Sequence, residues 1–207
     1  GAIKAPTKSS RKTNNTEYYA DHYNSAFMID TGSHPAIYHK SKLVPGIEMQ
    51  FSSALGKLVE KILPYICGTI LGYGIQKNRT CFTHSETRQS VAPVICYESV
   101  FGNFVADYVR KCAGALIIIS NDGWWKNTNG YFQHLTYASL RAIETRRPVA
   151  RCANTGVSCF IDIRGKRVRE TEWWTDSVIK GTICSGTKTT FYVRSGDYIY
   201  AMASLTC

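Results

Sequence analysis

The sequence has no two cysteines in C-x-x-C spacing, although it contains eight cysteines in 207 residues. Zinc sites and thiol redox motifs usually depend on such pairs, so a cysteine-based metal centre is not expected. Several of the cysteines lie inside apolar runs, where small buried thiols are common. A framework of disulfides is therefore not expected either, and the cysteine count leaves the redox compartment open.

The sequence also lacks a signal peptide and an uninterrupted apolar run long enough to cross a bilayer. The chain begins at Gly1, without an initiator methionine, and ends at Cys207. We therefore expect a piece of a longer protein, with any transmembrane segments outside residues 1–207. Its length fits one domain with a hydrophobic core.

Acidic residues are scarce, because 15 Asp and Glu stand against 25 Lys and Arg and give a formal net charge of +10. Such a charge suits an anionic partner, for example nucleic acid or a phospholipid surface. A basic surface that is only solvated would give the same net charge. Charge alone therefore leaves the partner open.

Apolar runs alternate with patterns of helical spacing along the chain. The run 115–120 is rich in isoleucine and apolar on both faces, which predicts a central strand covered on both sides. The order of the elements indicates an α/β fold with a layered, mixed sheet. Strands are expected at 24–30, 36–40, 91–96, 115–120, 149–153, 156–168 and 177–183, and helices at 52–66, 99–112 and 131–147.

Cys96 stands at the end of a predicted buried strand and just before a predicted helix. A thiol in this position is well placed as a nucleophile, because backbone N–H groups and the helix N-terminus favour a thiolate or an oxyanion. The position alone is more typical of a buried structural thiol. The polar neighbours Tyr97 and Glu98, where core would be expected, favour the catalytic interpretation.

A lysine and a glutamate flank the sharp bend "VPG" earlier in the chain. Lys40 ends an apolar strand and Glu48 follows eight residues later. The lysine could stabilise an oxyanion, and a solvated loop lysine is the alternative.

The turn "NDG" leaves the central strand at the edge that Cys96 would share if the strands are parallel. Trp124 and Trp125, which follow the turn, could line a pocket or simply cap the sheet. His134 could act as a base, and a packed, hydrogen-bonded histidine is the alternative.

Several motifs together resemble the nitrilase-like (carbon-nitrogen hydrolase) domain of apolipoprotein N-acyltransferases, in the same order over roughly residues 20–185. The motifs are "YHKSKLVPGIE", "APVICYESVFG", "NDGWW", "QHLTYASLRAIETRRPVARCANTG" and "IDIRGKRV". The resemblance implies an αββα sandwich. Residues 1–207 would form a single partial domain of this type, incomplete at its N-terminus.

The resemblance also implies a chemistry. Cys96 matches the nucleophile, Lys40 the lysine of a Glu-Lys-Cys triad, and Glu48 an additional essential glutamate. Tyr97 and Glu98 match residues that shape the nucleophile's pocket. The implied partners are a phospholipid acyl donor, an apolipoprotein acceptor and a membrane surface at the periplasmic face of the bacterial inner membrane. No metal, organic cofactor or nucleic acid is implied, and the oligomeric state is not predicted.

The triad glutamate is expected N-terminal to the lysine, and no glutamate of this sequence stands in the required motif. We therefore expect it outside the chain, and the chain alone to be inactive. Two other interpretations remain: a soluble carbon-nitrogen hydrolase acting on a small amide, and a catalytically inactive lipid-binding remnant.

The apolar segment 54–74 falls between the lysine and the cysteine motifs. It is interpreted either as a core helix followed by a buried strand, or as a mobile arm that dips into the outer part of the bilayer.

Overall fold

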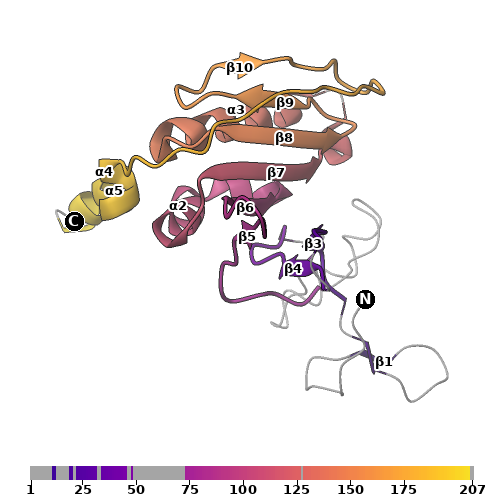
Figure 1. Ribbon diagram of the computed structural model, residues 1–207, viewed down its shortest axis with the longest axis horizontal. Helices are drawn as coiled ribbons and strands as arrows, with labels where there is room; N and C mark the ends of the chain where they lie inside the picture. Colours follow the sequence, from indigo (N-terminus) through magenta and orange to yellow (C-terminus); the bar gives the residue numbers. More distant parts are fainter. Residues whose placement is uncertain are drawn as a thin grey trace. The chain divides into compact units, whose positions relative to one another are not determined.

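The structure is a computed structural model that describes residues 11–12, 19–20, 22–31, 34–45, 48, 73–126 and 128–205 (Figure 1). The chain divides into two compact units. Unit 1 comprises Gly1–Ala26 and Ile37–Asn78, and unit 2 comprises Phe27–Ala36 and Arg79–Cys207. The expectation of a single partial domain stays a prediction.

The described part of unit 2 contains a six-stranded mixed sheet in the order β10-β9-β8-β7-β6-β5. The central strands β6, β7 and β8 are parallel, and the other neighbours pair antiparallel. This arrangement confirms the mixed α/β architecture. The strands are β5 (Phe82–Thr83), β6 (Ser90–Ile95), β7 (Ala115–Asn121), β8 (Val149–Asn154), β9 (Cys159–Ile161) and β10 (Arg167–Val168).

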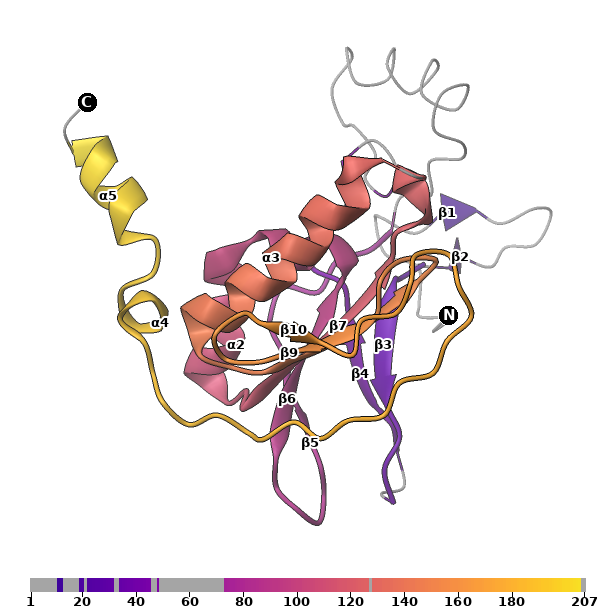
Figure 2. The ribbon, with the colours of Figure 1, turned by 90° about the horizontal axis from the view of Figure 1, so that it is seen from above.

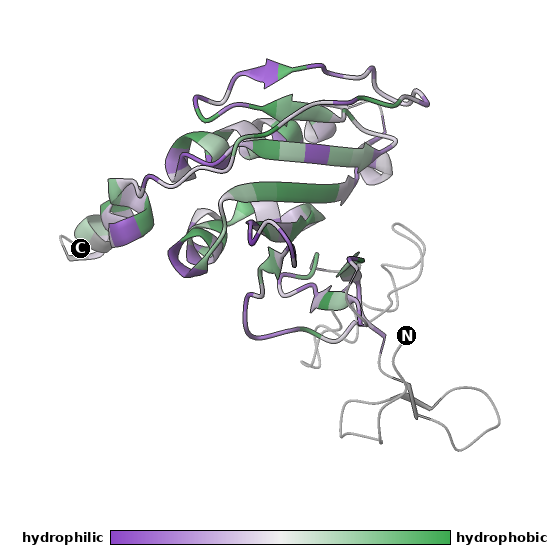
Figure 3. Ribbon diagram, in the orientation of Figure 1, coloured by the Kyte–Doolittle hydropathy of each residue, from purple (hydrophilic) through white to green (hydrophobic). Residues whose placement is uncertain are grey.

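Strand β7 is central, as its isoleucine-rich sequence predicts, and it is hydrophobic along nearly its whole length (Figure 3). Leu116 and Ile118 on one face are fully buried. On the other face Ala115 is buried, whereas Ile119 near the end of the strand is 42% exposed. The apolar run identified the strand, but it did not show how each face is covered.

Helices α2 and α3 lie on the same side of the sheet (Figure 2). Helix α3 begins after Thr128, whose hydroxyl accepts a hydrogen bond from the Gly130 N–H, and it ends before Arg146, which adopts a left-handed conformation. Pro148 follows and prevents continuation of the helix. The helices are η1 (Cys96–Val100), α2 (Gly102–Lys111), η2 (Gly123–Trp125), α3 (Asn129–Thr145), α4 (Phe191–Ser195) and α5 (Tyr198–Leu205).

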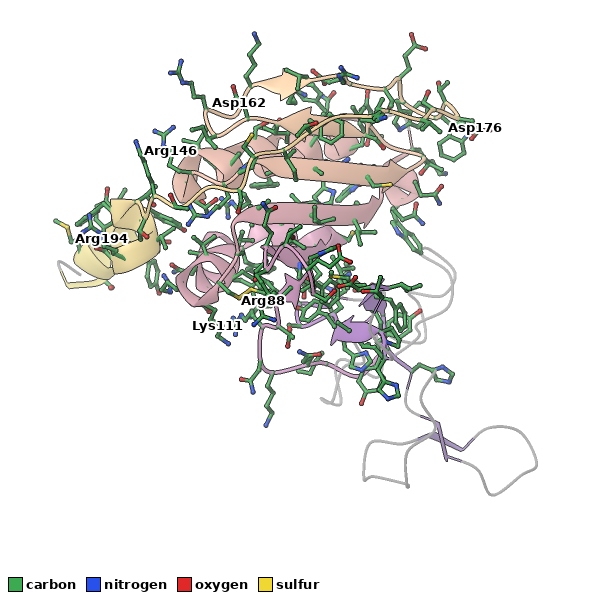
Figure 4. The ribbon with its side chains drawn as sticks, in the orientation of Figure 1. Arg88, Lys111, Arg146, Asp162, Asp176 and Arg194 are labelled. Atoms are coloured by element: carbon green, nitrogen blue, oxygen red, sulfur yellow. A yellow bond between two sulfur atoms is a disulfide. The ribbon has the colours of Figure 1, made fainter. Side chains whose placement is uncertain are left out.

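The segment 156–168, where strand was expected, contains β9 and β10, which pair as a hairpin. Its turn contains Asp162 (Figure 4), which accepts hydrogen bonds from the backbone N–H groups of Arg164 and Lys166 at 2.8 and 2.9 Å. The strand expected at 177–183 is wrong, because these residues have no ladder partner and form an irregular segment. Val178 within it is 98% exposed, so its β-forming sequence finds no sheet edge to join.

Short strand pairs precede the large sheet. Strands β3 (Ser25–Met28) and β4 (Ala36–His39) form a two-stranded sheet, which confirms the strand pair expected at 24–30 and 36–40. Strands β1 (Arg11–Lys12) and β2 (Tyr19–Ala20) form another antiparallel pair. The helix expected at 52–66 and most of the segment 54–74 lie outside the described residues. No described helix has the length and apolar character that a membrane span requires.

A disulfide joins Cys81, just before β5, to Cys112, the C-cap residue of α2. A framework of disulfides was not expected, and one bonded pair is not a framework. The pair itself was not predicted, because spacing along the chain does not show which residues meet in space. Cys159 is a buried free thiol, whereas Cys152 and Cys184 are exposed.

Replacing both Cys81 and Cys112 by serine is expected to lower the free energy of unfolding by about 2–4 kcal/mol, because the bond closes a loop and restricts the unfolded chain. Urea unfolding of parent and variant, with and without reductant, measures the difference. Reductant should remove most of the difference in stability between parent and variant. A Cys152→Ser variant serves as the control. A parent whose stability does not respond to reductant would contradict the assignment.

Candidate active site

Cys96 occupies a strand-to-helix turn at the carboxyl end of β6. Its φ of +50° lies in the left-handed region, which for a residue with a side chain costs about 1–2 kcal/mol. The residue is half-buried, and its thiol is not part of the disulfide. Strained backbone at a strand end is a common feature of functional sites. The structure therefore presents the thiol on a sharp turn rather than inside the core.

The residues after Cys96 form the helix η1. Glu98 is fully buried, and its carboxylate accepts a hydrogen bond from the Ile95 N–H at 2.8 Å. Tyr97 is half-buried, and its ring packs edge-on against Phe101. The buried carboxylate holds the end of β6 against the first turn of η1.

A buried network of polar side chains lies behind this turn. Asp122 follows β7, and its Oδ1 atom is 2.9 Å from Nδ1 of His134 on α3. Its Oδ2 atom accepts a hydrogen bond from Arg151 on β8 at 2.7 Å. Ser120 donates to Oδ1 at 2.8 Å. His134 is thus the packed, hydrogen-bonded histidine that sequence analysis gave as the alternative to a base.

Burial alone would raise the pKa of Asp122. The hydrogen bond from His134, the charge and hydrogen bond of Arg151, and the hydroxyl of Ser120 outweigh burial and lower its pKa from 3.8 to about 2. Asp122 is therefore an anion at neutral pH.

The two tryptophans after the central strand lie in η2. Trp124 and Trp125 are 59% and 47% exposed, so neither is a core residue. Trp125 lies against the start of α3, where a Cβ atom on Gly130 would come within 2.4 Å of the indole ring. Their expected role in a pocket stays a prediction.

Lys40 and Glu48 meet in unit 1. The Lys40 ammonium is 1% exposed and donates to both carboxylate oxygens of Glu48, at 2.9 and 2.7 Å. The same carboxylate accepts from the Asn24 side chain at 3.1 Å and the Val44 N–H at 2.8 Å. Lys40 is therefore not a solvated loop lysine, because a buried ion pair fixes its position.

The site residues expected from the sequence thus fall into two groups, one in each compact unit. Lys40 and Glu48 belong to unit 1, whereas the turn that begins at Cys96 and the tryptophans belong to unit 2. The membership of Lys40 and Cys96 in one triad, which the resemblance implies, stays a prediction. The sequence pattern did not indicate that Asp122 and Arg151 belong to one cluster. The arginine inside the apolar strand "VARCA" was the available signal, because a buried cation needs a partner.

No cluster of three or more potential metal ligands occurs among the residues that the structure describes. The chemistry that this arrangement offers is that of a thiol nucleophile. In unit 2, parallel strands carry this thiol and the buried Asp122 network toward the same edge of the sheet.

These features define a nitrilase-like α/β protein with a thiol at a strand end. A model of the carbon-nitrogen hydrolase family matches residues 5–190, and the chain belongs to this family. Two solved structures share the fold. Nit3 of Saccharomyces cerevisiae, from branch 10 of the nitrilase superfamily, matches with a TM-score of 0.51 at 18% identity over 74% of this chain and 51% of its own. XC1258 of Xanthomonas campestris, a CN-hydrolase superfamily protein, matches with a TM-score of 0.55 at 17% identity over 96% and 66%. The expected nitrilase-like fold is confirmed.

Curated relatives are more similar in sequence. The chain is 36% identical over 188 residues to the apolipoprotein N-acyltransferase of Chlorobaculum tepidum, covering 88% of this chain and 34% of that protein. It is 33% identical over 177 residues to the enzyme of the same name from Bradyrhizobium diazoefficiens, covering 84% and 32%. The chain spans about a third of the length of these relatives.

The Asp122→Asn variant is expected to be less stable than the parent above about pH 4, and the difference should shrink as the pH falls toward 2. The pKa of Asp122 is lower in the folded protein than its ordinary value, so its stabilising effect is lost as the carboxylate is protonated. Urea unfolding from pH 2 to pH 7 measures the effect. A stability difference that stays constant over this range would contradict the ion-pair assignment.

The Glu48→Gln variant is expected to lose about 3–5 kcal/mol of unfolding free energy, because it leaves the buried Lys40 ammonium without its counter-charge. Urea unfolding at pH 7 measures the loss. Glu86→Gln, at an exposed position, is the control and should change stability by less than about 0.5 kcal/mol. An equally small effect at Glu48 would mean that the ion pair is not buried in solution.

Proposed function

We propose that the chain is the acyl-transferring part of an apolipoprotein N-acyltransferase. Such an enzyme moves an acyl chain from a phospholipid to the N-terminal amine of diacylglyceryl-cysteine on an apolipoprotein. The observation that carries the proposal is the half-buried Cys96 thiol at a left-handed strand-to-helix turn, in a chain 36% identical to a protein of that name.

In the first proposed step, the Cys96 thiolate attacks the carbonyl carbon of the sn-1 ester. The sulfur–carbon bond forms, the ester carbon–oxygen bond breaks, and the lysophospholipid leaves. A glutamate that the resemblance implies before Lys40 takes the thiol proton and gives it to the leaving oxygen. An acyl group in thioester linkage to Cys96 remains.

In the second proposed step, the α-amine of the apolipoprotein attacks the thioester. A carbon–nitrogen bond forms, the carbon–sulfur bond breaks, and a proton of the amine returns to the sulfur through the same glutamate. Both steps pass through an oxyanion, and its proposed donors are Lys40 and the Tyr97 N–H. The ion pair with Glu48 supports this role, because it fixes the position of the lysine side chain.

The proposed location is the periplasmic face of the bacterial inner membrane, where the phospholipid donor and the apolipoprotein acceptor are both available. The Cys81–Cys112 disulfide supports this location, because such bonds persist in oxidising compartments and are rare in the cytosol. The net charge of +10 supports contact with an anionic lipid surface.

Incubating the full-length protein with a phospholipid that carries a fluorescent acyl chain is expected to label the peptide that contains Cys96. Adding a diacylglyceryl-cysteine lipopeptide should then move the label to the lipopeptide amine. Cys96→Ala should abolish labelling, because it removes the sulfur to which the acyl group is attached. Mass spectrometry of the peptides measures the labelling.

Cys152→Ala is the matched control, because it removes an exposed free thiol that is not at the turn. Labelling that survives Cys96→Ala would refute the assignment of the nucleophile. Release of the acyl group to water, with none transferred to the amine, would instead favour a hydrolase, the alternative that the family match supports.

A further inference from the structure

The carbonyl group of Cys96 is held by side chains from two other positions. The Ser99 hydroxyl donates to the Cys96 carbonyl oxygen at 2.8 Å, and Nε2 of His134 lies 3.1 Å from the same oxygen. Ser99 Oγ and His134 Nε2 are also 3.0 Å apart. A left-handed conformation persists at a residue with a side chain only where its surroundings fix it. These contacts fix the Cys96 carbonyl.

His134 is anchored on its other side. Its Nδ1 atom lies 2.9 Å from Asp122 Oδ1, and the second oxygen of that carboxylate is bound to Arg151. The backbone of Gly156 packs so closely that a Cβ atom there would come within 2.3 Å of Asp122 Oδ2. Both nitrogens of the ring are therefore engaged, and the carboxylate that orients the ring is itself held by Arg151 and Ser120.

The position of one carbonyl matters because of the peptide bond that follows it. The Cys96 carbonyl and the Tyr97 N–H belong to the same planar trans peptide group, in which the C=O and N–H bonds point in opposite directions. Turning the carbonyl toward His134 therefore turns the Tyr97 N–H away from the buried network. That N–H is the backbone donor proposed for the oxyanion, and its aim depends on where the carbonyl is held.

We propose that His134 and Asp122 are positioning residues that orient the Cys96–Tyr97 peptide group for acyl transfer. The inference rests on the proposed role of Cys96 as the nucleophile. Both side chains are buried and act through the backbone of the turn, so neither contacts the acyl donor. They should therefore affect the rate of thioester formation and leave substrate binding nearly unchanged.

Two substitutions of His134 separate this role from simple packing. In His134→Gln, the longer side chain can place an amide N–H near the Nε2 position and donate to the Cys96 carbonyl. In His134→Asn, the shorter side chain can place its amide near the Nδ1 position and contact Asp122, but it does not reach the carbonyl. Both variants replace the ring with an amide, each keeps one of the two contacts of the histidine, and Asn removes one methylene group more than Gln.

In the full-length protein, His134→Asn is expected to lower kcat for labelling of Cys96 by about 10–100-fold, because a small misplacement of a reacting group has effects of this size. KM should change little. His134→Gln should keep kcat within a few-fold of the parent, and thermal unfolding of both variants measures their stability separately from kcat. Equal values of kcat for the two variants would overturn the proposal.

Hydrogen–deuterium exchange of the peptide that spans residues 96–101 tests the positioning without a substrate. Exchange should be faster in His134→Asn than in His134→Gln or the parent, and equal exchange would overturn the proposal. If the His134 variants do not fold, Asp122→Asn provides the second variant. Faster exchange and a lower kcat are expected for it. Exchange and kcat equal to those of the parent would overturn the proposal. His84→Asn is the control, because this histidine is 42% exposed and lies outside the network.

The outcomes for the two proposals are distinct. A parent protein that forms no thioester at Cys96 would refute the proposed function, and the exchange experiment would still decide whether His134 holds the turn. A parent that forms the thioester, with variants that differ in neither kcat nor exchange, would refute only the positioning role.

Discussion

The interaction on which unit 2 most depends is the ion pair between Asp122 and Arg151, both almost completely excluded from water. Removing a carboxylate from water is unfavourable unless its oxygens are bound, and here a guanidinium, an imidazole and a hydroxyl bind them. The partners of Asp122 come from β7, β8 and α3, so satisfying one buried charge fixes the relative positions of these elements. Misplacing any of them would leave a charge buried without its partner.

That constraint extends to the chemistry through His134. The ring joins the buried carboxylate to the Cys96 carbonyl, and the turn on which the thiol sits is thus tied to the buried ion pair at the ends of β7 and β8. Reactive groups need positions fixed to a fraction of an ångström, and loops alone seldom provide this. A strained turn supported by a buried network gives a half-buried thiol together with a fixed backbone.

Local patterns were sufficient to predict much of this arrangement. The apolar runs ending at Cys96 and starting at Ala115 have the length and composition of buried strands, and Pro148 marks the end of α3. The Cys81–Cys112 bond could not be predicted, because it depends on contacts between residues far apart in the chain. The segment 177–183 has the composition of a strand, yet a strand also requires an unpaired neighbour, which composition does not reveal.

The basic composition has a second explanation once the interior is known. Arg141, Arg147 and Arg151 are all buried, and each binds groups inside unit 2. Arg147, for example, donates to the carbonyl oxygens of Ala113 and Lys188 and so links α2, α3 and the segment before α4. Burial lowers the pKa of Arg147, yet five N–H donors in one plane suit such a role better than a lysine ammonium would. The net charge of the chain therefore overstates the positive charge available to a partner, and any anionic surface must be met by the exposed lysines and arginines.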